Sequence, residues 1–106
     1  MKILLVEDDV EISDMLKKFL KTEGFEVIAA YDGESALERF WEEEYSLVLL
    51  DLMIPKIDGM EVMNAIREKS MVPIIILSVN GVFPVILTGV SFVAAALSVV
   101  HAETKD

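Results

Sequence analysis

The feature of this sequence that most constrains its fold is a regular alternation of short aliphatic runs with amphipathic helical patterns. The aliphatic runs are residues 2–6, 25–30, 47–50 and 72–78. Short runs that are apolar at nearly every position are typical of strands buried on both faces of a sheet. Strands that alternate with helices pair in parallel through right-handed crossovers. The order βαβαβαβ therefore predicts an α/β fold with an open parallel sheet covered by helices on both faces.

The segments between these runs carry apolar residues at helical spacing. The first helix is expected over residues 10–23, ending before Gly24, a typical residue after a helix C-terminus. The second follows a turn at residues 31–33, and the third spans residues 60–69. The side chains expected to face inward are Ile12, Met15, Leu16, Phe19 and Leu20, then Ala36, Leu37, Phe40 and Trp41, and finally Val62, Met63 and Ile66.

The chain is strongly acidic, with a net charge of −10 from 9 basic and 19 acidic side chains. This balance repels phosphate backbones and argues against direct binding of nucleic acid. It suits a divalent cation or a basic protein surface instead. The absence of cysteine excludes disulfides and thiolate metal sites, and the first apolar run is too short for a signal peptide. We therefore expect a cytoplasmic protein.

Acidic residues follow two of the predicted strands directly. Glu7, Asp8 and Asp9 come after the first strand, and Asp51 comes after the third. Ligands of open parallel sheets bind at the carboxyl ends of the strands, where the strand order reverses. If these two strands are neighbours, the carboxylates converge, and a set of oxygen ligands with an incomplete protein cage favours Mg²⁺. The competing interpretation is that the acids only cap helices, which we prefer for Asp9.

Ser78 ends the fourth predicted strand at the same edge of the sheet. A hydroxyl at this position could donate to a phosphoryl oxygen on Asp51. The alternative is that Ser78 is an ordinary turn residue.

Three motifs resemble the receiver domain of bacterial two-component response regulators. They are ILLVEDD at residues 3–9, DLMIPKIDG at 51–59 and VPIIILS at 72–78. The second is the most specific, and together they place the resemblance in residues 1–78. The resemblance implies a flavodoxin-like, doubly wound parallel sheet. The flanking sequence is similar to the subgroup whose full-length members carry winged-helix DNA-binding domains.

The resemblance also implies roles for individual residues. Asp51 matches the aspartate that a partner histidine kinase phosphorylates. Asp8 matches a direct Mg²⁺ ligand, Glu7 a ligand acting mostly through water, and the backbone carbonyl of Met53 the third protein ligand. Ser78 matches the hydroxyl residue that moves toward the phosphoryl group. Such a module is a phosphoacceptor rather than an enzyme, although it takes part in its own phosphotransfer and dephosphorylation.

The resemblance stops after Ser78. A receiver continues with a fourth helix, a fifth strand that ends in a lysine followed by proline, and a fifth helix. The only lysine beyond residue 69 is Lys105, which has no proline after it and is not given the family role. We therefore divide the chain into a receiver-like part, residues 1–78, and an atypical apolar tail, residues 79–106. The fold is expected to be incomplete after the fourth strand, and the receiver truncated or degenerate.

Several interpretations of the tail stay open. Asn80-Gly81 predicts a tight hairpin turn, and residues 90–102 a helix. Residues 81–100 are uncharged and long enough to cross a bilayer, which suggests a membrane-tethered receiver, a less favoured reading because no basic cluster flanks them. A shifted reading frame or an engineered splice also explains the tail. In a folded protein, the unfilled apolar surface also favours a homodimer, with or without exchange of the tail between copies. A further alternative is a non-switching structural module that dimerises through residues 79–102.

Overall fold

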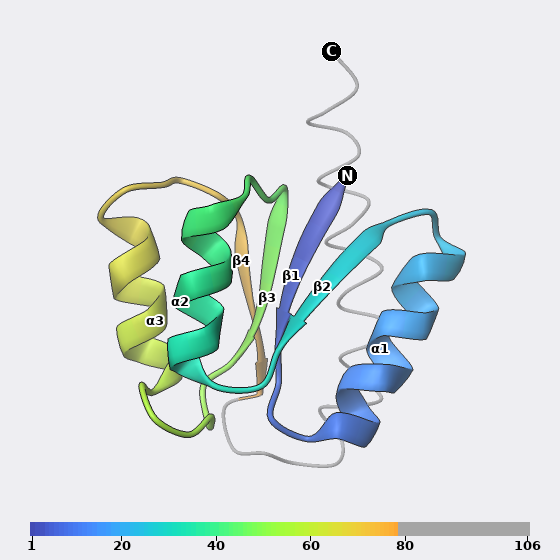
Figure 1. Cartoon of the computed structure of the whole chain (residues 1–106), viewed down its shortest axis with the longest axis horizontal. Helices are drawn as coiled ribbons and strands as arrows, with labels where there is room; N and C mark the ends of the chain where they lie inside the picture. Colours follow the sequence, from blue (N-terminus) through green and yellow to red (C-terminus); the bar gives the residue numbers. More distant parts are fainter. Residues whose placement is uncertain (79–106) are drawn as a thin grey trace.

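The computed structural model describes residues 1–78, which form an α/β fold with one parallel sheet of four strands (Figure 1). In chain order the elements are β1 (Lys2–Val6), α1 (Val10–Thr22), β2 (Glu26–Ala30), α2 (Gly33–Glu42), β3 (Leu47–Asp51), α3 (Gly59–Arg67) and β4 (Ile74–Ser78). The predicted order βαβαβαβ is confirmed.

The strands lie in the order β2-β1-β3-β4, and every neighbouring pair is parallel. Val6, the last residue of β1, pairs with Ala30 of β2 on one side and with Leu50 of β3 on the other. The chain thus moves from β1 outward in one direction, then crosses back to β3 on the opposite side. This reversal creates a topological switch point between the carboxyl ends of β1 and β3.

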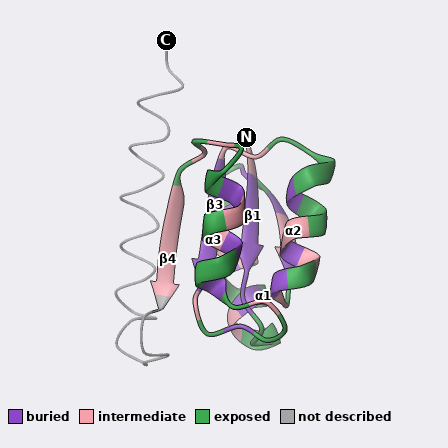
Figure 2. Cartoon of the chain, turned by 90° about the vertical axis from the view of Figure 1, so that its left-hand side faces the viewer, coloured by how far each residue is buried: buried purple, intermediate pink, exposed green. Residues whose placement is uncertain are grey.

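The sheet separates two hydrophobic clusters, because successive side chains of a strand point to opposite faces. Ile3 and Leu5 of β1 pack on the face covered by α1, whereas Leu4 and Val6 pack on the face covered by α2 and α3. All four side chains are fully buried. Figures 1 and 2 show the same layers, with α1 on one side of the sheet and α2 and α3 on the other. The continuous aliphatic runs therefore reflect strands buried on both faces.

Each helix of the described part of the chain begins after an aspartate whose carboxylate accepts a hydrogen bond from a backbone N–H three residues later. Asp9 accepts from Ile12 at 3.1 Å, Asp32 from Ser35 at 2.7 Å and Asp58 from Glu61 at 3.0 Å. Such caps satisfy N–H groups that have no partner within the helix. The expectation that Asp9 caps the first helix is confirmed.

Two side chains expected to face the core are instead partly exposed. Trp41 is 48% exposed and Met15 is 42% exposed. Trp41 directly follows Phe40, so it points about 100° away around α2, and Phe40 takes the core position. The Trp41 ring stands edge-on to Phe40 with centroids 5.1 Å apart, and the Lys69 ammonium lies 5.3 Å from the Trp41 ring centroid.

The boundaries shift slightly from the expected ones at several element ends. The largest differences are that α3 ends at Arg67 rather than at residue 69 and that β4 begins at Ile74 rather than at residue 72. Pro73 lies just before the strand, where its carbonyl accepts from the Val48 N–H at 2.9 Å. The hairpin, the helix and the membrane span expected in residues 79–106 lie outside the described residues. Among residues 1–78, no helix is long and apolar enough to cross a membrane.

Candidate metal centre

The predicted acidic residues lie at the switch point of the sheet. Asp51 is the last residue of β3, and Glu7 directly follows β1. The Glu7 N–H donates to the Ala30 carbonyl at 3.1 Å, which continues the β1–β2 pairing by one residue. The backbone of Glu7 is therefore held by the sheet and does not belong to a free loop.

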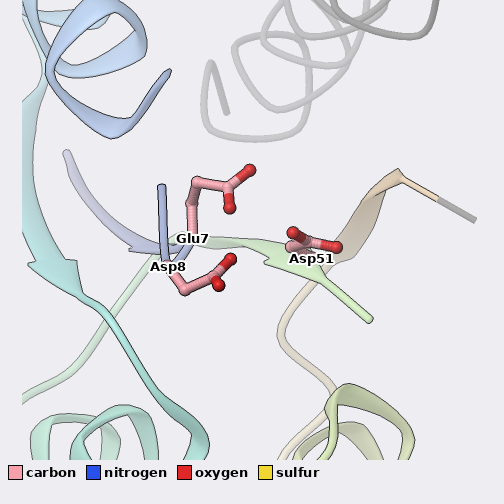
Figure 3. Close-up of side chains that lie close together, drawn as sticks. All are labelled: Glu7, Asp8 and Asp51. Carbon is pink, nitrogen blue, oxygen red and sulfur yellow. The ribbon is translucent and has the colours of Figure 1, made fainter. Parts of the chain in front are cut away.

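Three carboxylates converge at this edge (Figure 3). Glu7, Asp8 and Asp51 each offer an oxygen atom, and these atoms all lie within 4.8 Å of one another. Glu7 is 6% exposed and Asp51 is 5% exposed, whereas Asp8 is exposed. The cluster thus has two buried carboxylates and one that faces solvent. The sequence led us to expect this convergence, provided that the first and third strands were neighbours.

The electrostatics of the cluster favour a bound cation. Burial above all, together with the neighbouring carboxylates of Asp51 and Asp8, raises the pKa of Glu7 to about 8 against the opposing effect of the Asp9 N–H. That N–H donates to Glu7 Oε2 at 3.1 Å. A buried carboxylate beside other carboxylates ionises at neutral pH only at a cost, unless a positive charge compensates it. A divalent cation in the cluster supplies that charge.

The loop after β3 folds back onto Asp51. The Met53 N–H donates to Asp51 Oδ1 at 2.9 Å, which places the Met53 backbone beside the carboxylate. The Met53 side chain is 63% exposed, so any role of this residue at the site belongs to its backbone. Gly59 closes the other end of the loop, where its N–H donates to the Leu52 carbonyl at 3.2 Å. A Cβ atom on Gly59 would lie 2.7 Å from the Asp51 carbonyl oxygen, which explains why a glycine occupies this position.

Ser78 lies opposite Asp51 in the pairing of β3 with β4. The register shifts between Leu50 and Asp51, so the pairing is irregular at the point where the site begins. The backbone of Ser78 is therefore at the same edge of the sheet as the three carboxylates.

Sequence reasoning missed one group of contacts near the site. Asp32 and Gly33 were expected to form only a turn, but they contact the loop between β3 and α3 at Pro55, Lys56 and Ile57. An Asp-Gly pair before a helical pattern is a signal for a helix start. No local pattern indicates which distant loop that helix start contacts.

The residues present fit Mg²⁺. All side-chain donors in the cluster are carboxylate oxygens, which hard cations prefer, and the exposed side at Asp8 leaves room for water or a phosphate to complete the shell. Within residues 1–78, no sulfur or imidazole ligand accompanies the three carboxylates, so this donor set does not favour zinc.

Known proteins similar to this chain agree on its family. The family model described as "Response regulator receiver domain" matches residues 3–97, which reaches beyond the motifs that end at residue 78. An uncharacterized transcriptional regulatory protein of Bacillus subtilis, YcbL, is 47% identical over 75 residues. That match covers 71% of this chain but only 33% of YcbL, so the chain spans about a third of this relative's length.

Solved structures show the same similarity. The response regulator TrrA from Thermotoga maritima, in complex with Mg(2+)-BeF, is 43% identical with a TM-score of 0.63, and the match covers 65% of this chain and 60% of that one. A structure of the histidine kinase ThkA in complex with TrrA matches at 38% identity and a TM-score of 0.67, covering 79% of this chain and 76% of that one. The family match, the flavodoxin-like sheet and the acidic cluster at its switch point agree, and the chain belongs to the receiver domains of two-component response regulators.

Proposed function

We propose that this chain is a phosphoacceptor receiver in which Asp51 accepts a phosphoryl group in a Mg²⁺-dependent reaction. The observation that carries the proposal is the convergence of Glu7, Asp8 and Asp51 within 4.8 Å at the carboxyl ends of β1 and β3. In this proposal Asp8, Asp51 and the Met53 carbonyl bind Mg²⁺ directly, and Glu7 binds it through water. The complex of the similar receiver TrrA with Mg(2+)-BeF supports the assignment.

Each residue has a distinct task in the proposed reaction. Bound Mg²⁺ lowers the electrostatic cost of bringing an anionic phosphoryl donor to a carboxylate. One Asp51 oxygen forms a bond to phosphorus while the bond between phosphorus and the leaving group of the donor breaks, and the electron pair of that bond stays on the leaving group. The Met53 N–H holds Asp51 Oδ1, so it fixes the orientation of the nucleophile. The product is an aspartyl phosphate, a reactive acyl phosphate suited to a transient signal.

We propose a histidine kinase as the phosphoryl donor, in the cytoplasm. The support is the solved complex between the similar receiver TrrA and the histidine kinase ThkA. The acidic charge of the chain, −10 in total, suits a basic docking surface on such a partner.

Two further assignments concern the switch. Ser78 is proposed as the hydroxyl that responds to the phosphoryl group, and its backbone position opposite Asp51 supports this. The sequence has no lysine between residue 69 and Lys105, so no residue is assigned to the phosphoryl-contacting lysine of the family. We propose that phosphorylation still occurs but that the conformational response is weakened, as in a degenerate receiver.

The phosphoacceptor role is tested by incubating the protein with Mg²⁺ and acetyl phosphate and weighing it intact. We expect one added phosphoryl group on the unmodified protein and none on Asp51→Asn. The matched control is Asp58→Asn, which changes an acid of the same loop while keeping a residue that caps α3. An added phosphoryl group on Asp51→Asn would show that Asp51 is not the phosphoacceptor.

The metal assignment is tested by titrating Mg²⁺ into Asp8→Ala, which we expect to lose most of its affinity. Asp9→Asn is the control, because Asp9 is adjacent but caps α1. Equal affinity in Asp8→Ala and the unmodified protein contradicts the proposed ligand.

The missing lysine also favours a second candidate, a structural module that dimerises through residues 79–102. Sedimentation of the full chain separates the two, because this candidate requires a dimer whether or not Asp51 is phosphorylated. A monomer that accepts a phosphoryl group excludes it.

A further inference from the structure

The loop between β3 and α3, residues 52–58, is attached to the first turn of α2 through three consecutive residues. The Gly33 N–H donates to the Pro55 carbonyl at 3.2 Å. The Lys56 ammonium lies 3.6 Å from Asp32 Oδ2. Gly33 packs closely on Ile57, because a Cβ atom added to Gly33 would lie 2.8 Å from the Ile57 carbonyl carbon. We call these five residues, Asp32, Gly33, Pro55, Lys56 and Ile57, the α2–loop clasp.

Asp32 serves the clasp and the helix at the same time. Its Oδ1 accepts from the Ser35 N–H at 2.7 Å, and its Oδ2 faces Lys56. The Asp32 side chain is 18% exposed and the Lys56 side chain is 58% exposed, so water reaches the pair mainly from the lysine side. The Ser35 N–H, followed by the Lys56 ammonium, lowers the pKa of Asp32. The carboxylate is therefore charged in both of its roles.

Lys56 has a backbone conformation that needs support. Its φ is 69°, and it is the only non-glycine residue with a positive φ among residues 1–78. Residues that carry a Cβ atom rarely adopt this backbone conformation. It persists where the surrounding structure holds the residue in place. The neighbouring contacts of Pro55 and Ile57 with Gly33 provide that support.

We propose that Asp32, Gly33 and Lys56 are positioning residues for the metal centre, an inference that rests on the proposed function. Met53, the proposed carbonyl ligand, lies two residues before Pro55, and its N–H is bonded to the Asp51 carboxylate. The clasp holds the distal half of the loop, so it restricts the position of the Met53 backbone relative to Asp51. The clasp residues act through Met53 and do not themselves bind the cation.

Calorimetric titration of the full chain with Mg²⁺ and, separately, with Ca²⁺ tests this proposal. Lys56→Met and Asp32→Asn both remove the ion pair, and asparagine keeps the helix cap. Outer residues that orient metal ligands typically change affinity by 10–100-fold, and for this more exposed pair we expect Mg²⁺ to bind about threefold to tenfold more weakly. Ca²⁺ binding should change less, since Ca²⁺ tolerates irregular geometry whereas Mg²⁺ requires a near-ideal octahedron.

Further variants separate positioning from a general loss of stability. Both substitutions remove the same ion pair between Asp32 and Lys56. The Asp32→Asn/Lys56→Met double variant should therefore bind Mg²⁺ no more weakly than the single variant with the lower Mg²⁺ affinity. Lys56→Arg keeps the positive charge, so it should bind Mg²⁺ about as tightly as the unmodified protein. Lys18→Met is the matched control, since it removes the same charge from an exposed lysine of α1 that has no ion pair within residues 1–78.

The outcomes distinguish the two proposals. An unmodified protein that binds no Mg²⁺ and accepts no phosphoryl group overturns the proposed function and the clasp with it. Normal Mg²⁺ binding by the unmodified protein and by both single variants overturns the clasp alone, as does an equal loss of Mg²⁺ and Ca²⁺ affinity. Gly33→Ala tests the close contact with Ile57, and the two side-chain variants keep the test decisive if Gly33→Ala does not fold.

Discussion

At the scale of single residues, Glu7 has the most strongly shifted pKa among the described residues. It is buried beside Asp51 at the end of β1, and its pKa is raised to about 8. In the metal-free protein this carboxyl therefore keeps its proton at neutral pH. Because a cation in the cluster favours the charged form, Mg²⁺ binding and deprotonation of Glu7 should be coupled.

We predict that the stability of the metal-free protein falls as pH rises from about 4.5 to about 8. The folded state keeps the Glu7 proton across this range, whereas the unfolded state releases it near the ordinary value of 4.5. The contribution is complete below 4.5 and is lost as pH rises through about 8. Urea unfolding in EDTA at a series of pH values measures it. Glu7→Gln should flatten the slope over this range, and an identical slope in both proteins would contradict the assignment.

At the scale of secondary-structure elements, the sequence marks the N-terminus of each described helix clearly, but it places one polar residue at a buried position. The three helices within residues 1–78 all begin with an aspartate cap, followed by a glutamate in the first turn. Ser13 of α1 is fully buried, however, and its hydroxyl has no hydrogen-bond partner among the described residues. A buried hydroxyl without a partner costs free energy.

Ser13→Ala should therefore stabilise the protein by about 1 kcal/mol, since it removes an unpaired hydroxyl and adds helix propensity. Chemical denaturation in EDTA measures the change in the free energy of unfolding. A loss of stability would show that the hydroxyl has a partner after all.

Removal of a cap should have the opposite effect. We expect Asp58→Ala to destabilise the protein by about 1 kcal/mol, because the Glu61 N–H loses its acceptor. Asp58→Asn is the control and should stay close to the unmodified protein. If both variants are equally destabilised, the negative charge of Asp58 matters rather than its hydrogen bond.

At the scale of the whole molecule, the fold concentrates negative charge at one edge of the sheet. The net charge is −10, and two of the carboxylates at the switch point are buried. A ligand that binds only the folded state stabilises that state by mass action. The metal centre and the stability of the whole domain are therefore linked.

Mg²⁺ should raise the free energy of unfolding by about 2.7 kcal/mol when its concentration is 100 times the dissociation constant. Thermal or urea unfolding with and without Mg²⁺ measures this gain. Asp51→Ala should abolish most of it, whereas Asp9→Asn should keep it. A gain of the same size in Asp51→Ala would show that Mg²⁺ binds elsewhere.

The sequence by itself determined the alternation of strands and helices and the position of the acidic residues at the strand ends. These features are local: aliphatic runs, helical spacing and an aspartate before a helix report on a few neighbouring residues. Only the tertiary structure decided that β1 and β3 are neighbours, so that Asp8 and Asp51 meet. It also decided that Trp41 is partly exposed and that Asp32 contacts Lys56. Strand order and contacts between distant segments depend on how the layers pack, and local sequence patterns carry little information about that.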